Sequence, residues 1–149
     1  MHPVSGKPGP VQALARASTI PLAAGENLMG ETAFAAAQDA GALAVIQPDL
    51  AKWGGFSGCL PVARRALAAG LRFFPHYLGA GIGLIAAGHL LAAAGGDGRL
   101  EVDANENPLR DEVATPLATL RDGIIDLGDA PGLGITPDLE RRARFRVRF

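Results

Sequence analysis

Four titratable side chains recur at nearly even intervals along this chain of 149 residues, and each closes a short apolar run. They are Glu26, Asp49, His76 and Glu101, separated by 23, 27 and 25 residues. A carboxylate can bind a hard cation, because such cations prefer oxygen ligands. An imidazole beside a carboxylate can act as a general base, because the carboxylate orients the ring and stabilises its charged form. Brought together, the four side chains would form a proton-transfer set.

Intervals of this length fit one strand plus one helix, repeated along the chain. The apolar runs do not alternate with polar residues, which is typical of strands covered on both faces. We expect strands over residues 20–25, 43–47, 71–75 and 99–103. Helices are expected over residues 11–17, 32–40, 57–69 and from the glycines near 80 to about 94. The alternation predicts an α/β fold with a parallel sheet and right-handed crossovers. Pro61 is expected in the first turn of its helix, where proline is tolerated.

Spacing alone leaves two interpretations of the four residues open. Polar residues at the carboxyl ends of parallel strands converge on one face of a barrel, where active sites are built. In the first interpretation the four residues are such a site. In the second, Glu26 and Glu101 are solvated side chains at strand ends, and His76 is a core histidine whose hydrogen bonds are satisfied.

Composition narrows the class of protein. Apolar residues make up 48% of the chain and charged residues 19%, which indicates a globular domain. The net charge of −1 gives no general electrostatic case for binding nucleic acid or an anionic membrane. No apolar run approaches the length of a membrane-spanning helix. The single cysteine, Cys59, excludes an intramolecular disulfide and suits a reducing compartment. Residues 1–10 lack the apolar core of a signal peptide, so we expect a cytoplasmic location.

The last third of the chain has a different pattern. Turn-forming residues dominate from residue 105 onward, and a short strand is expected over residues 124–127. Between residues 144 and 149, arginine alternates with apolar residues, which predicts an edge strand with one wet face. RNA binding by this basic run is the less favoured alternative, because the run is short and no basic patch accompanies it.

The residues around the four positions point to a known family. Gly25-Glu26-Asn27, Gln47-Pro48-Asp49 with Lys52-Trp53-Gly54-Gly55, Pro75-His76, Leu100-Glu101 and the segment 129–134 occur in this order. Together they resemble the enolase superfamily, mandelate racemase subgroup, from about residue 11 to the end. The resemblance implies a (β/α)7β TIM-like barrel, of which this chain represents the C-terminal half, with about four parallel strands, intervening helices and an irregular tail. Residues 1–10 are expected to be a disordered leader and residues 11–104 a partial barrel. Residues 105–149 would be a tail that in the family packs partly on an N-terminal capping domain.

The resemblance also implies roles for individual residues. Glu26 matches the third carboxylate ligand of the family's Mg²⁺. Asp49 and His76 match a dyad in which the histidine removes the proton α to a substrate carboxylate. Glu101 matches the acid that hydrogen-bonds this carboxylate as it becomes an enediolate.

Three more residues are weaker substrate-binding candidates. Lys52 is either a cation at the rim of the site or a base, as in the muconate-lactonizing relatives, and we favour the supporting role. Trp53 and Tyr77 are either pocket walls or packing residues. The expected ligand is a small carboxylate or acid sugar.

Two functions therefore remain open. In the first, the chain is the C-terminal portion of a Mg²⁺-dependent acid-sugar dehydratase or racemase. In the second, it is a truncated, inactive homologue that acts at most as an association module. The two earlier acidic metal ligands and the Lys-x-Lys motif of the family are not found in this sequence, and exposed barrel edges would favour a homo-oligomer.

Overall fold

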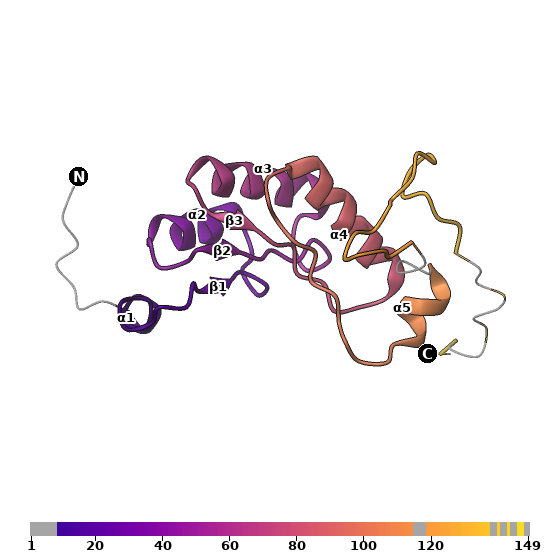
Figure 1. Ribbon diagram of the computed structural model, residues 1–149, viewed down its shortest axis with the longest axis horizontal. Coiled ribbons are helices and arrows are strands. Elements are labelled where there is room, and N and C mark those ends of the chain that lie inside the picture. The colour runs from indigo at the N-terminus through magenta and orange to yellow at the C-terminus, as the bar shows by residue number, and fades with distance from the viewer. Residues whose placement is uncertain (1–8, 115–118, 138–139, 141–142, 144–145, 148–149) are drawn as a thin grey trace.

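The computed structural model describes residues 9–114, 119–137, 140, 143 and 146–147. Strands and helices alternate as expected for an α/β fold (Figure 1). The elements are α1 (Pro10–Ala17), β1 (Ala23–Ala24), α2 (Glu31–Asp39), β2 (Val45–Ile46), α3 (Gly55–Ala68), β3 (Arg72–Phe73), α4 (Gly81–Ala94) and α5 (Pro108–Val113). The sequence does not predict the helix α5, because turn-forming residues dominate from residue 105 onward. Its Asn107 side chain accepts a hydrogen bond from the Arg110 backbone N–H, which caps the helix.

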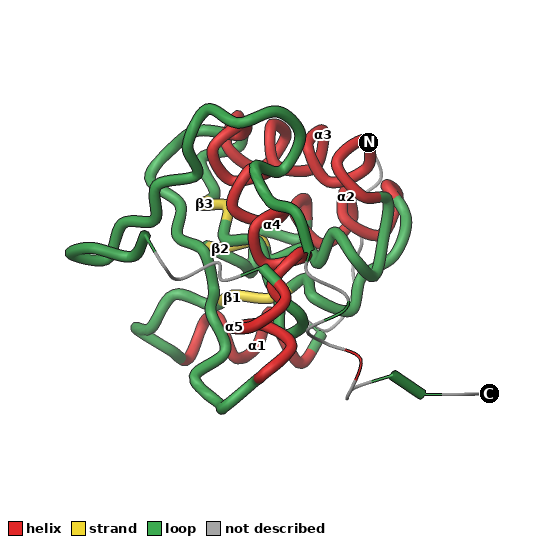
Figure 2. The backbone as a smooth tube through the Cα atoms, turned by 90° about the vertical axis from the view of Figure 1, so that its right-hand side faces the viewer, coloured by secondary structure: helices red, strands yellow, loops and turns green. Residues whose placement is uncertain are grey.

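The three strands form one parallel sheet in the order β1-β2-β3, side by side in Figure 2. This confirms the predicted parallel sheet. Each strand is shorter than predicted, and proline lies close to all three: Pro21 precedes β1, and Pro48 and Pro75 follow β2 and β3. Proline has no N–H to donate to a ladder, so it limits how far pairing can extend. Single backbone hydrogen bonds continue past the strands, as from Phe74 N to Ile46 O at 3.1 Å.

The predicted fourth strand is wrong in the described part of the chain. Residues 99–103 run beside β3 without the backbone pairing that defines a strand. The two residues before this segment, Asp97 and Gly98, contact β3 through other interactions. Arg72 donates from Nη2 to the carbonyl of Asp97 at 3.1 Å, and Gly98 lies so close to the carbonyl of Phe73 that a side chain would not fit. The segment still brings Glu101 to the end of the sheet.

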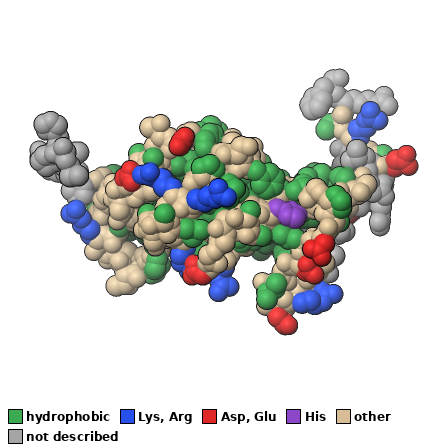
Figure 3. Space-filling model, turned by 90° about the horizontal axis from the view of Figure 1, so that it is seen from above, with side chains coloured by type: hydrophobic (Ala, Val, Ile, Leu, Met, Phe, Trp, Pro, Cys, Tyr) green, Lys and Arg blue, Asp and Glu red, His purple; other side chains and the backbone are tan. Residues whose placement is uncertain are grey.

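The core lies between the sheet and the helices packed on it. Four fully buried side chains come from four elements, namely Phe34 of α2, Ile46 of β2, Phe73 of β3 and Leu90 of α4. Burying a side chain of this size stabilises the fold by about 1.5–3 kcal/mol. α2, α3 and α4 lie on one side of the strands (Figure 1), and the face formed over α3 and α4 shows hydrophobic side chains along its middle (Figure 3).

Two features of the helices differ from expectation. α3 begins at Gly55, so Pro61 lies inside the helix and not in its first turn. There its ring removes the hydrogen bond to the residue four positions earlier. α1 buries none of its residues, and its apolar Val11 and Leu14 are about half exposed. None of the helices in the described ranges is long and apolar enough to cross a membrane.

The predictions for the two ends of the chain can be compared with the structure only in part. The predicted strand over residues 124–127 is not formed, and only a single antiparallel bridge joins Arg121 and Ile124. Of the predicted edge strand, residues 144, 145, 148 and 149 lie outside the described residues, and Arg146 and Val147 are not in a strand. Of the expected leader, residues 1–8 also lie outside them, and Pro10 already belongs to α1.

Candidate active site

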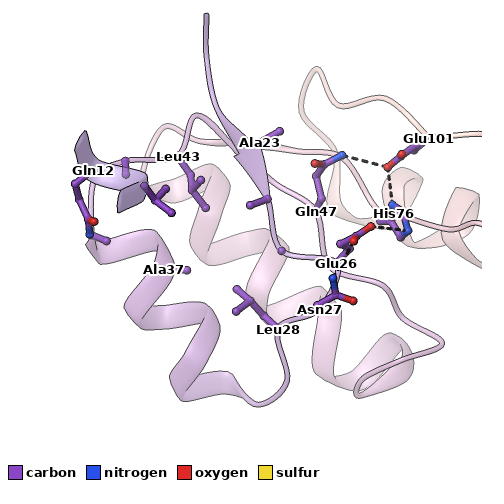
Figure 4. A pocket seen from close by; sticks show the side chains of 15 residues that line it. Gln12, Ala23, Glu26, Asn27, Leu28, Ala37, Leu43, Gln47, His76 and Glu101 are labelled. Atoms are coloured by element: carbon purple, nitrogen blue, oxygen red, sulfur yellow. Dashed lines mark hydrogen bonds and ion pairs between the residues drawn. The ribbon is translucent and has the colours of Figure 1, made fainter. Parts of the chain in front are cut away.

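Three of the four spaced residues meet where the strands end. Glu26 follows β1, His76 follows β3, and Glu101 lies in the extended segment beside β3. Parallel strands direct their carboxyl ends to one edge of a sheet, which is why residues 25 or more positions apart can touch. Figure 4 shows the three side chains in one chain of contacts. The structure therefore brings these three side chains together.

His76 lies between the two carboxylates. Its Nε2 is 2.9 Å from Glu26 Oε2, and its Nδ1 is 2.8 Å from Glu101 Oε2. Its side chain is 7% exposed, whereas those of Glu26 and Glu101 are 45% and 38% exposed. The backbone N–H of His76 donates to Pro48 O at 3.1 Å, which fixes the residue against the end of β2. A neutral imidazole donates from one nitrogen only, but an imidazolium donates from both. Both contacts are therefore hydrogen bonds only when both ring nitrogens carry a proton.

Two side-chain amides extend this chain of contacts. Asn27 donates from Nδ2 to Glu26 Oε1 at 2.9 Å, and Gln47 donates from Nε2 to Glu101 Oε2 at 3.2 Å. Lys52 donates from Nζ to Asn27 Oδ1 at 3.1 Å. The sequence alone predicts no role for Asn27 or Gln47. The signal that could have found them was their position, because each lies at a strand end next to, or two residues from, a candidate acid.

No hydrogen bond or ion pair joins the side chains of Asp49 and His76, which the resemblance pairs as a dyad. Its Oδ1 accepts hydrogen bonds from the backbone N–H groups of Ala51 at 2.8 Å and Lys52 at 3.3 Å. Its Oδ2 lies 3.9 Å from Lys52 Nζ. These donors are two and three residues away, so a tight turn satisfies Asp49 without reaching the imidazole. Asp49 is nonetheless 6% exposed, and its buried charge affects its neighbours.

One affected neighbour is the Cys59 thiol. Burial, with a further contribution from the charge of Asp49, raises the pKa of Cys59 to about 11. Cys59 is buried in the core and donates from Sγ to the carbonyl of Trp53 at 3.2 Å. It therefore behaves as a small core residue.

Trp53 and Tyr77 both pack against protein. The ring of Trp53 lies 5.2 Å from that of Phe34, between ring centroids, and covers Gly58. The ring of Tyr77 lies over Gly79 and Gly83, leaving no room for a side chain at either glycine. Burial and the charge of Asp49 raise the pKa of Tyr77, while a hydrogen bond with the Ala80 backbone lowers it. The packing alternative therefore describes both residues better than the pocket-wall alternative.

A pocket of about 610 Å³ opens beside β1 and ends at this cluster. Its polar end is formed by Glu26, Asn27, Gln47, His76 and Glu101, drawn in Figure 4. Its other walls are mostly apolar and come from α1, β1, α2 and the residues before β2. Lys52, Trp53 and Tyr77 do not line it. The pocket is large enough for a small polar molecule with one end at His76.

The described residues do not fit a Mg²⁺ site by themselves. No three or more histidine, cysteine, aspartate or glutamate side chains within those ranges are grouped so that they could hold a metal ion. Glu26, the one ligand expected, uses one oxygen toward His76 and the other toward Asn27. A single carboxylate with both oxygens engaged does not hold Mg²⁺, which needs an octahedral set of oxygen ligands.

Comparison with known proteins gives consistent matches. The model of the enolase C-terminal domain-like family matches residues 2–142. The crystal structure of a mandelate racemase/muconate lactonizing enzyme from Bordetella bronchiseptica RB50 is 58% identical, with a TM-score of 0.86, and the match covers 93% of this chain and 39% of that one. The structure of the 3,6-anhydro-D-galactonate cycloisomerase from Zobellia galactanivorans is 30% identical, with a TM-score of 0.82 and coverages of 91% and 38%.

Similar sequences among curated proteins include sugar-acid cycloisomerases and dehydratases. A D-galactarolactone cycloisomerase from Agrobacterium fabrum (strain C58) is 34% identical over 136 residues, which are 86% of this chain and 36% of that protein. An arabinonate dehydratase from Saccharolobus solfataricus is 29% identical over 123 residues, covering 83% and 33%. The chain thus spans little more than a third of the length of these relatives.

Proposed function

The chain belongs to the enolase C-terminal domain-like family, and from this premise we propose that it carries the acid–base part of an enzyme acting on a small acid sugar. The observation that supports the proposal is the position of His76, buried at the end of a pocket with a carboxylate at each ring nitrogen. The reaction begins with transfer of the proton α to the substrate carboxylate onto His76.

The cluster favours this transfer through charge. A ring nitrogen can take the proton only while its carboxylate is turned away, so the substrate must first displace Glu26 or Glu101 from His76. The neutral imidazole that takes the proton becomes an imidazolium, which donates from its other nitrogen to the carboxylate that remains. Opposite charges at hydrogen-bond distance stabilise the charged ring. The electron pair left on the substrate forms an enediolate. The imidazolium then gives its proton to the β-hydroxyl, which leaves as water while the electron pair of the enediolate forms the double bond of the dehydrated product. We favour this outcome because an arabinonate dehydratase is among the similar proteins.

Asp49 and Glu26 have narrower roles in this proposal than the resemblance implies. Asp49 holds the turn that carries Lys52, because its carboxylate accepts from the N–H groups of that turn. Glu26 would supply one oxygen ligand if Mg²⁺ binds, and the remaining ligands would have to come from outside the described residues.

The proposal is tested by deuterium exchange. The 149-residue chain is incubated in D2O with an aldonate such as arabinonate and Mg²⁺, and loss of the α-proton signal is followed by NMR. We expect exchange in the wild type and its loss in His76→Asn. The matched control is His89→Asn, because His89 lies in α4 away from the pocket lining. Exchange that persists in His76→Asn would remove His76 from the base role.

A second function is favoured by the surface beside β1. Ala23 and Ala24 are exposed, and α1 buries no residue, so a strand edge and an amphipathic helix lie open together. An open parallel edge can pair with another chain. If wild-type exchange is absent and sedimentation shows a stable oligomer, the association-module function is supported instead.

A further inference from the structure

Each carboxylate that flanks His76 receives one side-chain amide donor. Asn27 Nδ2 donates to Glu26 Oε1 at 2.9 Å, and Gln47 Nε2 donates to Glu101 Oε2 at 3.2 Å. The result is a linear order of amide, carboxylate, imidazole, carboxylate and amide (Figure 4). Glu26 and Glu101 are both more than a third exposed, so without these donors water would compete for their oxygens.

The orientation of the Asn27 amide is set from outside the cluster. Lys52 Nζ, which can only donate, lies 3.1 Å from Asn27 Oδ1. The amide oxygen must therefore face Lys52, and the amide NH2 must face Glu26. This gives Lys52 a place in the site without contact to the pocket: it fixes the amide that fixes Glu26.

The position of Gln47 is set by the backbone. Its N–H donates to Ala24 O at 2.9 Å, so the residue is bonded to the end of β1. Gly25 permits this approach, because a Cβ there would lie 2.9 Å from Gln47 N. From this anchored position the Gln47 side chain spans to Glu101, which lies 54 residues later in the chain. Gln47 Nε2 and His76 Nδ1 converge on the same oxygen, Glu101 Oε2.

We propose that Asn27 and Gln47 are positioning residues, each of which fixes one carboxylate on one nitrogen of His76. Asn27 acts on the Nε2 side through Glu26, and Gln47 acts on the Nδ1 side through Glu101. That this positioning serves proton transfer rests on the proposed function. The positioning of the two carboxylates by Asn27 and Gln47 does not rest on it. Neither residue needs to touch the substrate for this role.

The test uses the 149-residue chain with 15N-labelled histidine and measures exchange of the two His76 ring protons with water by NMR. The variants are Gln47→Met and Asn27→Leu, which keep side-chain size and remove the donor. Gln12→Leu is the matched control, because Gln12 is an amide in the same pocket wall that does not contact either carboxylate. Backbone amide spectra report whether each variant keeps its fold, and Gln47→Leu and Asn27→Ala serve if either does not.

The expected result is side-specific. Gln47→Met should make the Nδ1 proton exchange about tenfold faster, equivalent to about 1.4 kcal/mol, and leave the Nε2 proton unchanged. Asn27→Leu should do the reverse, and Gln12→Leu should change neither. Equal effects on both nitrogens from either variant, or no effect from both, would overturn the proposal. Because no turnover is measured, failure here is distinguishable from failure of the deuterium-exchange test.

Discussion

The close approach of β1 to Gln47 can be tested with one methyl group. Gly25 has φ 141°, a region that side chains rarely adopt, and an added Cβ would lie 2.9 Å from Gln47 N and 3.1 Å from Gln47 C. These are backbone atoms held by the Gln47 N to Ala24 O hydrogen bond, so they cannot rotate away. Gly25→Ala should therefore separate the ends of β1 and β2.

The control is Gly30→Ala. Gly30 also has a positive φ, 86°, but nothing lies within 4 Å of the Cβ that would be added. Both variants suffer backbone strain of about 1–3 kcal/mol, offset by about 0.4–1 kcal/mol because alanine restricts the unfolded chain. Only Gly25→Ala also suffers overpacking, which costs about 1–3 kcal/mol. The difference between the variants isolates the contact with Gln47.

Urea unfolding followed by circular dichroism measures this difference. With an m-value of about 2 kcal/mol/M, an extra loss of about 2 kcal/mol lowers the midpoint of Gly25→Ala by about 1 M relative to Gly30→Ala. If the two variants unfold within about 0.2 M of each other, the approach at Gly25 is not as close as described, and the argument that it anchors Gln47 fails.

Three further predictions concern Pro61 and Cys59 of α3. Pro61→Ala should raise the free energy of unfolding by about 1–3 kcal/mol, because it restores a hydrogen bond inside the helix. The control, Pro10→Ala at the start of α1, should change the free energy of unfolding by less than about 0.5 kcal/mol. A Pro61→Ala variant that is less stable than the wild type in urea unfolding would contradict this prediction. Cys59 should react with an uncharged thiol reagent much more slowly in the folded than in the urea-unfolded chain, because the thiol is fully buried and burial raises its pKa from 9.0 to about 11. The free energy of unfolding should also fall as the pH rises from 9 to 11, since only the unfolded chain loses the thiol proton there, and Cys59→Ala should remove this part of the pH dependence.

Sequence predicted the order of the elements well because the signals are local. Prolines and glycines mark the strand ends, and small apolar residues fill the helices between them. The parallel sheet follows from that order, whereas the approach of Glu26 and His76 was only one of two interpretations that the spacing left open. The fourth strand failed because pairing depends on a distant neighbour: at β3, Arg72 and Asp97 bond through side-chain and carbonyl groups where a ladder was expected.

The local hydrogen bonds of Asp49 have a related cause. A carboxylate that begins a turn can accept from the N–H groups two and three residues later, and closing such a short loop costs little chain entropy. Reaching His76 requires a contact across 27 positions in sequence. Both outcomes suit the same motif, so the sequence could not decide between them, and in this structure the local donors, Ala51 and Lys52, hold the carboxylate.

The imidazole therefore depends on residues that sequence reasoning treated as secondary. With Asp49 engaged in its own turn, the groups that hold the His76 ring are Glu26 and Glu101, and the groups that hold those are Asn27 and Gln47. Gln47 in turn depends on the distance between β1 and β2, which Gly25 sets. A change at Gly25 should accordingly act on the Nδ1 side of His76 through Gln47, even though Gly25 precedes the acid on the Nε2 side. If Gly25→Ala is made in the ring-proton experiment, faster exchange at Nδ1 would link the backbone geometry of the sheet to the proton-transfer group, and an unchanged Nδ1 proton would show that Gln47 reaches Glu101 independently of β1.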